Sequence, residues 1–294
     1  MQSSRSKGIY MILVGASLWG ASGTAVQYLF EQKHLSPDWL LMVRMIVAGL
    51  IMLIYDKYAG RDIWAIWRHP THRYKIIIYA IIGMFMTQYG YFIAIQYGNA
   101  ATATVLQYLM PVIVLVYSLW RTKHFPGKIE VTAVFLATMG TYLLVTKGNW
   151  DTLAISQQTL FWGILSAFAM AFYTLYPREM LKTYSSTMVI GWSMFIGGIF
   201  INVFLQPWPF IGIMDFGTVI GMTVLILFGT LIAFYCYLDS TKYIKASEVG
   251  ALASVEPLSS VLLAVVILHV DFGLAEILGV ACIISTVFLL ARQK

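Results

Sequence analysis

Two ionisable side chains stand inside long apolar stretches, where a charge is costly and usually faces protein or water. Glu256 lies ten residues into the stretch 246–270. It can take up a proton or pair with a cationic substrate; alternatively, hydroxyl and backbone groups hold it beside Pro257, where it only fixes helix packing. Arg44 lies about two turns into the stretch 37–55. Its guanidinium can attract an anion at the mouth of a cavity, or its long side chain can snorkel to the interface.

Polar and aromatic side chains recur at helical spacing in several other apolar stretches. The candidates for lining a substrate cavity are Trp19, Ser22, Thr24, Gln27, Gln88, Tyr91, Thr104, Gln107, Tyr108, Tyr173 and Tyr235. Aromatic rings can enclose an organic cation or border a planar metabolite; alternatively, each of these residues packs one helix against another. Trp19 stands out because it lies in mid-span, whereas tryptophan in membrane proteins is enriched at the two interfaces.

Motifs for enzymatic chemistry are missing from the sequence. There is no G-x-x-x-x-G-K-[ST] phosphate-binding loop and no H-E-x-x-H metal motif. The two cysteines, Cys236 and Cys282, fall inside apolar stretches and offer neither a disulfide framework nor metal-ligand spacing. We therefore expect no catalytic residues, no metal site, no cofactor and no enzymatic activity.

The elements that position these side chains are long apolar helices. Of the 294 residues, 60% are hydrophobic and 11% are charged, and the mean hydropathy is +0.78. A soluble chain carries about 25% charged residues. The apolar blocks are about 20 residues long, as a membrane-spanning helix requires. This composition predicts an all-α integral membrane protein with ten transmembrane helices. The predicted spans are residues 8–30, 37–55, 74–97, 100–120, 128–146, 158–176, 187–205, 216–238, 246–270 and 274–291.

The basic residues predict how these spans are oriented. With a cytoplasmic N-terminus, the inner segments contain 16 of the 19 lysines and arginines. These are Arg5, Lys7, Lys57, Arg61, Arg68, Arg73, Lys75, Arg121, Lys123, Lys128, Arg178, Lys182, Lys242, Lys245, Arg292 and Lys294. The outer segments contain only Lys33 and Lys147. This asymmetry predicts that both termini are cytoplasmic, and it explains the net charge of +6 without a nucleic-acid partner.

Two segments of the chain share a pattern that indicates an internal repeat. Superimposing Pro111 on Pro257, an offset of 146 residues, aligns residues 98–117 with residues 244–263. Both segments have a polar helix start, small residues and one mid-span proline, which frees the carbonyl four residues before it. The predicted halves are residues 1–149 and 150–294, each with five spans. Because five is odd, the halves must be inverted relative to each other, as in many secondary transporters. Pro111 and Pro257 are then candidate hinges.

The chain resembles the drug/metabolite transporter superfamily, in its ten-helix EamA branch. The resemblance rests on Trp19-Gly20 followed by small residues, on NAATATVLQYLMPV at 99–112 and on KASEVGALASVEPLSSVLLAVV at 245–266. It implies a carrier of two inverted five-helix repeats around a central cavity. Members often have a glutamate near the end of the fourth span. Here Trp120-Arg121-Thr122-Lys123 stands there, and His269-Val270-Asp271 follows the ninth span, so no coupling role is transferred to these positions.

The sequence thus predicts a secondary active transporter in the plasma membrane. It would move a small organic metabolite such as an amino acid, an amine, a nucleoside or a drug-like compound by alternating access, driven by a proton or substrate gradient. Its partners would be the lipid bilayer, the solute and a coupling proton. The alternative is a non-transporting membrane receptor or scaffold protein, which would be expected to carry a soluble domain or a long loop.

Overall fold

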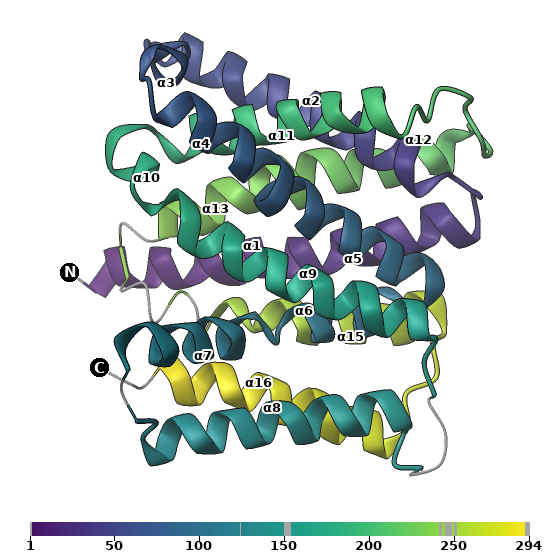
Figure 1. Cartoon of the computed structure of the whole chain (residues 1–294). Coiled ribbons are helices and arrows are strands. Elements are labelled where there is room, and N and C mark those ends of the chain that lie inside the picture. Colours follow the sequence, from purple (N-terminus) through teal and green to yellow (C-terminus); the bar gives the residue numbers. More distant parts are fainter. Residues whose placement is uncertain are drawn as a thin grey trace.

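The computed structural model describes residues 2–123, 125–149, 154–240, 243–244, 249 and 252–291. Within these residues the chain is helical and contains no strand, which confirms the predicted all-α fold. The helices run roughly side by side in one bundle (Figure 1). The predicted start of the ninth span at Ala246, and the basic residues Lys242, Lys245, Arg292 and Lys294, lie outside the described residues.

Eight helical segments of the described chain are long and apolar enough to cross a membrane. Four of them are single helices: α1 (Gln2–Glu31), α2 (Pro37–Tyr58), α8 (Lys128–Thr146) and α11 (Ser186–Phe204). A fifth is α9 (Gln157–Leu175) continued by the short 3-10 helix η2 (Tyr176–Arg178). The other three are composed of α4 (His72–Ile78), η1 (Tyr79–Phe85) and α5 (Met86–Tyr97); of α6 (Ala100–Gln107) and α7 (Met110–Thr122); and of α12 (Phe216–Thr223), η3 (Val224–Ile232) and α13 (Ala233–Ser240). The last two predicted spans fall on shorter apolar helices, α15 (Val255–Leu268) and α16 (Leu274–Ala291).

The two repeat prolines begin new helices instead of bending continuous ones. Pro111 lies in the first turn of α7, after a break at Tyr108 and Leu109 that separates α7 from α6. Pro257 likewise lies in the first turn of α15. Proline has no N–H to donate, and the first turn of a helix is where no such donor is needed. Both breaks therefore have a local cause in the sequence.

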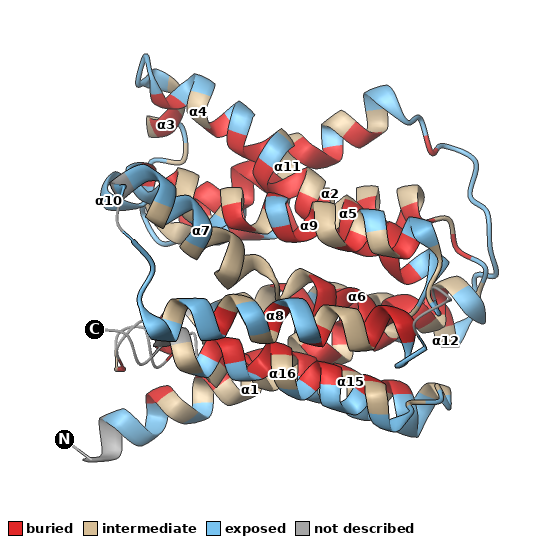
Figure 2. Ribbon diagram, turned by 60° about the horizontal axis from the view of Figure 1, so that its bottom comes forward, coloured by how far each residue is buried: buried red, intermediate tan, exposed pale blue. Residues whose placement is uncertain are grey.

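Close backbone contacts hold several helix pairs together. The most extensive contacts are between α2 and α11, α8 and α16, and α5 and α9, while α1 packs against α13, η3 and α15. A Cβ added to Gly140 of α8 would lie 2.7 Å from the carbonyl oxygen of Gly279 of α16, and the converse distance is the same. Small residues let membrane helices approach this closely. Buried residues line the contacts between helices, while exposed residues lie on outward faces (Figure 2).

Ion pairs gather at the two ends of the bundle. The end where α1 begins and α16 finishes also carries α3 (Ala65–Arg68) and α10 (Met180–Thr183), and is called the α3 end (Figure 1). Its ion pairs include Arg61–Asp56, Arg68–Asp62 and Lys75–Glu179. The opposite end, where α12 begins, is called the α12 end and has the pairs Lys33–Asp215 and Lys147–Glu276. The Lys33 ammonium, with the Thr218 N–H, lowers the pKa of Asp215 to about 2.

Candidate functional site

A cluster of three hydroxyl groups lies in the interior, where α5, α6 and α15 meet. The Tyr91 hydroxyl lies 2.8 Å from Thr104 Oγ1, and Ser260 Oγ lies 3.3 Å from the same atom. Thr104 donates its own proton to the carbonyl of Ala100 one turn earlier, at 2.7 Å. Tyr91 therefore donates to Thr104, which leaves the lone pairs of the Tyr91 oxygen available to another donor. We call Tyr91, Thr104 and Ser260 the hydroxyl cluster.

Two glycines of α1 make room for this arrangement. A Cβ on Gly23 would clash with the Tyr91 hydroxyl oxygen. A Cβ on Gly20 would clash with Ser259 Oγ and lie 2.8 Å from both the Glu256 carbonyl oxygen and the Ser260 nitrogen. The absence of side chains at these two positions thus brings the α1 backbone against polar groups of α5 and α15.

Next to the hydroxyl cluster, the Tyr108 hydroxyl faces two acceptors. It lies 2.7 Å from the Ala253 carbonyl oxygen and 3.0 Å from Glu256 Oε2. Ala253 precedes Pro257 by four residues, so its carbonyl has no helical N–H partner. The sequence predicted that the Ala253 carbonyl would lack a helical hydrogen bond. The structure shows that the Tyr108 hydroxyl, at the α6–α7 break, donates a hydrogen bond to it.

The two contacts of Tyr108 depend on the protonation state of Glu256. A phenol has one proton, so it cannot donate to the Ala253 carbonyl and to an ionised carboxylate at the same time. If Glu256 is protonated, its carboxyl group donates to the Tyr108 oxygen while Tyr108 donates to Ala253. Both observed distances are then hydrogen bonds, so the geometry fits a neutral carboxyl group.

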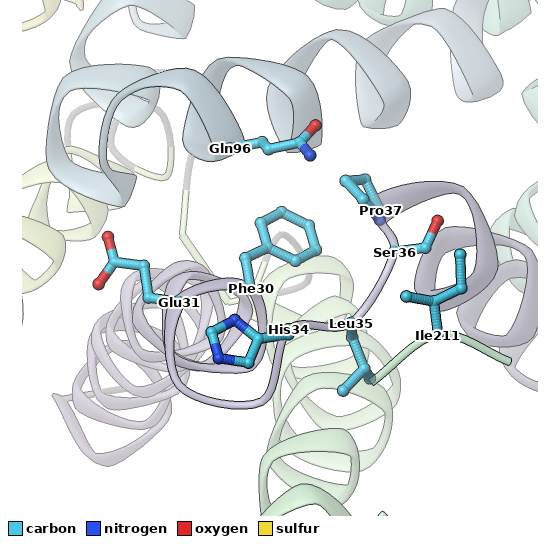
Figure 3. A pocket seen from close by; sticks show the side chains of 8 residues that line it. All are labelled: Phe30, Glu31, His34, Leu35, Ser36, Pro37, Gln96 and Ile211. Atoms are coloured by element: carbon cyan, nitrogen blue, oxygen red, sulfur yellow. The ribbon is translucent and has the colours of Figure 1, made fainter. Parts of the chain in front are cut away.

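A chain of hydrogen bonds connects the hydroxyl cluster with the α12 end. The Gln27 amide donates to Glu31 Oε1 at 2.9 Å, and its oxygen accepts the Ala100 N–H at 2.9 Å. The Ala100 carbonyl in turn accepts from Thr104. Glu31 borders a pocket of about 320 Å³. The pocket is lined by Phe30, Glu31, His34, Leu35, Ser36, Pro37, Gln96 and Ile211. Figure 3 shows the Phe30 ring at the centre of these residues, with Gln96 of α5 across from it.

Arg44 points into the bundle from α2, and the snorkelling alternative is wrong for this structure. Its residue surface is 5% exposed. Nε donates to Thr230 Oγ1 of η3 at 3.0 Å, and Nη1 donates to Gln88 Oε1 of α5 at 3.0 Å. The guanidinium carbon also lies 5.5 Å from the centre of the Phe92 ring. Arg44 thus joins α2 to both α5 and η3.

Comparison with known proteins identifies the family of this chain. The profile of the EamA-like transporter family matches residues 6–146 and again residues 157–292. The chain belongs to the EamA-like transporter family. It is 36% identical over 291 residues to an uncharacterized inner membrane transporter, YicL, of Salmonella typhimurium, covering 99% of this chain and 97% of that protein. It is 23% identical to an uncharacterized transporter, YetK, of Bacillus subtilis, covering 99% and 88% of the two chains.

A solved crystal structure has the same fold as this EamA-like chain. The TM-score is 0.65 at 18% identity, with 98% of this chain and 97% of the other chain covered. At that identity the likeness concerns the fold alone. Membership of this family, together with the long apolar helices, establishes a multi-pass membrane protein of a transporter family.

Other predicted site residues of this EamA-like protein make aromatic packing contacts or local hydrogen bonds. Trp19 packs against Phe234 and Tyr237, with ring centres 5.1 Å apart in both pairs. Tyr173 stacks on Tyr79 at 5.4 Å. The remaining predicted residues have local roles: Ser22 and Thr24 donate to backbone carbonyls of α1 at Trp19 and Gly20, and Gln107 ends α6 half-buried.

Tyr235 does not join this network. It is 54% exposed and faces away from the interior, while Tyr237 packs on Trp19. Two residues apart on a helix means about 200° of rotation, so only one of these two tyrosines can face inward. The change of register in the preceding π-helix decides which one does, and the sequence alone does not show that register.

Sequence reasoning also missed two residues of the network. Ser260 lies four residues after Glu256 and therefore on the same helix face, a signal that helical spacing could have supplied. Thr230 lies within η3, where its hydroxyl donates to the Leu225 carbonyl five residues earlier. Among the described residues, no group of three His, Cys, Asp or Glu side chains is placed to hold a metal ion.

Proposed function

We propose that this protein is a secondary carrier that moves a small organic metabolite across the plasma membrane by alternating access. The observation that carries the proposal is the interior polar network, to which both halves of the chain contribute. Tyr91, Thr104 and Tyr108 come from the first half, and Glu256 and Ser260 come from the second. Buried polar groups in a membrane protein are costly and usually mark a substrate or ion pathway. The naming of the YicL relative as an inner membrane transporter supports the choice of membrane.

Several features support ten spans arranged as two inverted repeats, residues 1–149 and 150–294. The π-helical segments η1 and η3 occur in the third predicted span of each half. Gly83 of η1 and Gly229 of η3 are 146 residues apart, the same offset as Pro111 and Pro257. The family profile also matches the chain twice, once in each half.

The helix contacts fit the same symmetry. The pairs α2–α11 and α8–α16 join corresponding spans of the two halves. The contact of α1 with η3 and α13 corresponds to the contact of α9 with η1 and α5. In carriers built from inverted repeats, the solute binds near the bilayer midplane at the repeat interface. In this proposal the hydroxyl cluster and Glu256 form that site. In this proposal the α3 end and both termini face the cytoplasm.

We assign the coupling proton to Glu256. In the neutral state its carboxyl group donates to Tyr108, and Tyr108 holds the Ala253 carbonyl at the helix break before Pro257. On ionisation the Glu256 carboxylate can only accept, and the Tyr108 hydroxyl donates its single hydrogen bond to it. The Ala253 carbonyl then loses its hydrogen-bond partner. Proton release would thus loosen the contact between the α6–α7 break and the start of α15, which are the two candidate hinges. Solute and proton movements are coupled if the two alternating conformations differ in this contact.

Flux measurements test the carrier proposal directly. Purified protein is reconstituted in proteoliposomes, and uptake of labelled amino acids, amines, nucleosides and carboxylic acids is followed with and without an imposed pH gradient. We expect saturable uptake of at least one solute that protein-free liposomes lack. Binding of a solute without flux across the whole panel would favour the receptor alternative and overturn the proposal.

A further inference from the structure

Arg44 is a buried cation without a counter-charge. Among the described residues, no other lysine or arginine is buried. The ion pairs Arg61–Asp56, Arg68–Asp62, Lys75–Glu179, Lys33–Asp215 and Lys147–Glu276 lie at the ends of the bundle, and none of them includes Arg44. Glu256, the acidic residue of the network, is bonded to Tyr108. Within the part of the chain that the structure describes, no carboxylate lies at ion-pair distance from the Arg44 guanidinium.

The hydrogen bonds of Arg44 leave donors unused. A guanidinium has five N–H groups, and Arg44 uses two of them, one to Thr230 and one to Gln88. Both acceptors are neutral side-chain oxygens on rotatable bonds. The remaining N–H groups have no acceptor among the described residues. A planar fork of this kind binds a carboxylate through two parallel hydrogen bonds better than any neutral group.

The free-energy cost of burying the Arg44 charge favours an anion beside its guanidinium. Taking a charged group out of water costs several kcal/mol even after relaxation, and hydrogen bonds to neutral oxygens recover only part of that free energy. If the role of Arg44 were only to tie α2 to η3 and α5, a neutral amide would serve with less desolvation. A permanent charge therefore points to a transient partner with the opposite charge.

The pocket at the α12 end is connected to Arg44 through two aromatic rings. Its central residue, Phe30, packs edge-on against Phe92 with ring centres 5.7 Å apart, and Phe92 contacts the Arg44 guanidinium on α2. One layer of two aromatic rings thus separates the pocket from the charge. The volume of about 320 Å³ suits a small metabolite. The Glu31 carboxylate lies in the pocket wall (Figure 3), and its negative charge repels a doubly charged phosphate ester more strongly than a monocarboxylate.

We propose that Arg44 is the binding group for a carboxylate, so that the solute carried by this protein is a small monocarboxylate or contains one carboxylate group. This assignment rests on the proposed carrier function. The solute would enter from the α12 end, pass the Phe30–Phe92 pair and exchange Thr230 and Gln88 for its carboxylate as partners of Arg44.

Ligand-dependent thermal unfolding of the full chain in detergent tests the assignment. The probes are three acid and amide pairs of matched shape: propionate and propionamide, benzoate and benzamide, nicotinate and nicotinamide, at constant ionic strength. We expect at least one acid to raise the unfolding temperature while its amide does not. The Arg44→Gln variant should bind that acid roughly 30-fold more weakly or worse. Arg121→Gln, which removes an exposed arginine at the end of α7, should bind it normally.

A second measurement uses the unaltered protein, in case Arg44→Gln does not fold. Phenylglyoxal modifies arginine guanidinium groups, and peptide mass spectrometry quantifies its reaction with Arg44 and Arg121. The stabilising acid should protect Arg44 and not Arg121. Equal effects of acids and amides, equal binding by Arg44→Gln, or absence of protection would overturn the assignment.

The two proposals fail in different ways. Flux of amines or nucleosides without carboxylate binding would leave the carrier function intact and overturn the role of Arg44. Carboxylate binding that depends on Arg44, without flux of any solute, would support this binding site and reject transport. Stabilisation by glucose 6-phosphate in preference to every monocarboxylate would also overturn the assignment.

Discussion

The Tyr108 hydroxyl lies 2.7 Å from the Ala253 carbonyl, the backbone acceptor that Pro257 leaves without a helical partner. This contact joins the break between α6 and α7 to the start of α15, so the two proline-containing segments meet in space as well as in sequence pattern. Glu256 Oε2 lies 3.0 Å from the same hydroxyl. The Tyr108 hydroxyl therefore connects the titratable carboxyl group of Glu256 to the Ala253 carbonyl at the helix break before Pro257.

Replacing Glu256 with Gln should separate proton coupling from solute movement. The amide nitrogen can donate to Tyr108 as a protonated carboxyl group does, so the variant mimics the neutral state and should fold. Accumulation driven by a pH gradient should collapse, while counterflow of labelled against unlabelled solute should persist. Glu179→Gln, at an exposed glutamate of the α3 end, is the matched control and should keep both activities. Normal pH-driven accumulation in Glu256→Gln would end the coupling hypothesis.

Removing the Tyr108 hydroxyl should destabilise the protein. Tyr108→Phe leaves the buried Ala253 carbonyl without a partner, and an unsatisfied buried polar group costs about 1–3 kcal/mol. The unfolding temperature in detergent should fall, and it should fall less in Tyr176→Phe, whose ring is held by stacking on Phe172. If the two variants unfold at the same temperature, the hydrogen bond to Ala253 is not a stabilising contact.

Much of the fold was predictable because lipid imposes simple rules on sequence. Length, hydropathy and turn residues placed the helices, and eight predicted spans coincide with helical segments long enough to cross a membrane. The local consequence of Pro257 was predictable as well, since a missing N–H always frees the same carbonyl. The π-helical segments η1 and η3 were not predictable, because their register depends on packing with neighbouring helices.

The sequence predicted most of the residues that form the site, but only part of how they are arranged in space. Arg44 and Glu256 stood out because charge inside apolar helices is rare. The partners of Arg44 could not be assigned, since Thr230 faces α2 only through the register of η3. Tyr235 was misplaced for the same reason. Long-range contacts such as Gln27 with Ala100 depend on how α1 lies across α6, which no local pattern encodes.

The close approach of α1 to α15 predicts a strong steric effect at Gly20. In Gly20→Val the new side chain meets the Glu256 carbonyl and Ser259, and backbone atoms cannot move aside as a flexible side chain can. Overpacking of this kind costs about 1–3 kcal/mol, so the unfolding temperature should fall and binding of any stabilising solute should weaken. Gly127→Ala, where only Glu130 Oε2 lies near, at 3.6 Å, is the control and should lower the unfolding temperature much less. Equal stability of the two variants would contradict the close contact.

The proposed orientation predicts which loops a membrane-impermeant thiol reagent reaches from outside the cell. In a background with Cys236 and Cys282 replaced by Ala, single cysteines at Asn149 and Pro209 of the α12 end should be labelled in intact cells. Cysteines at Tyr58 and Lys123 should be labelled only after the membrane is opened. Protection of both Asn149 and Pro209 in intact cells would reverse the orientation of the bundle.

Asp215 gives a pH dependence at the α12 end that can be followed through one backbone amide. Its carboxylate accepts the Thr218 N–H at 2.9 Å and binds Lys33 Nζ at 2.6 Å, and these contacts lower its pKa from 3.8 to about 2. Since the pKa is lower in the folded state, the stabilising contribution is complete above pH 3.8 and is lost as the pH falls towards 2. Hydrogen exchange of the peptide containing Thr218, corrected for intrinsic rates, should show equal protection at pH 7 and pH 5 and weaker protection near pH 3. Lys33→Met should move this loss to higher pH, and Asp215→Asn should lower protection at pH 7 and pH 5 and remove the loss near pH 3. A loss of protection in the unaltered protein already between pH 7 and pH 5 would show that another group controls this end of the bundle.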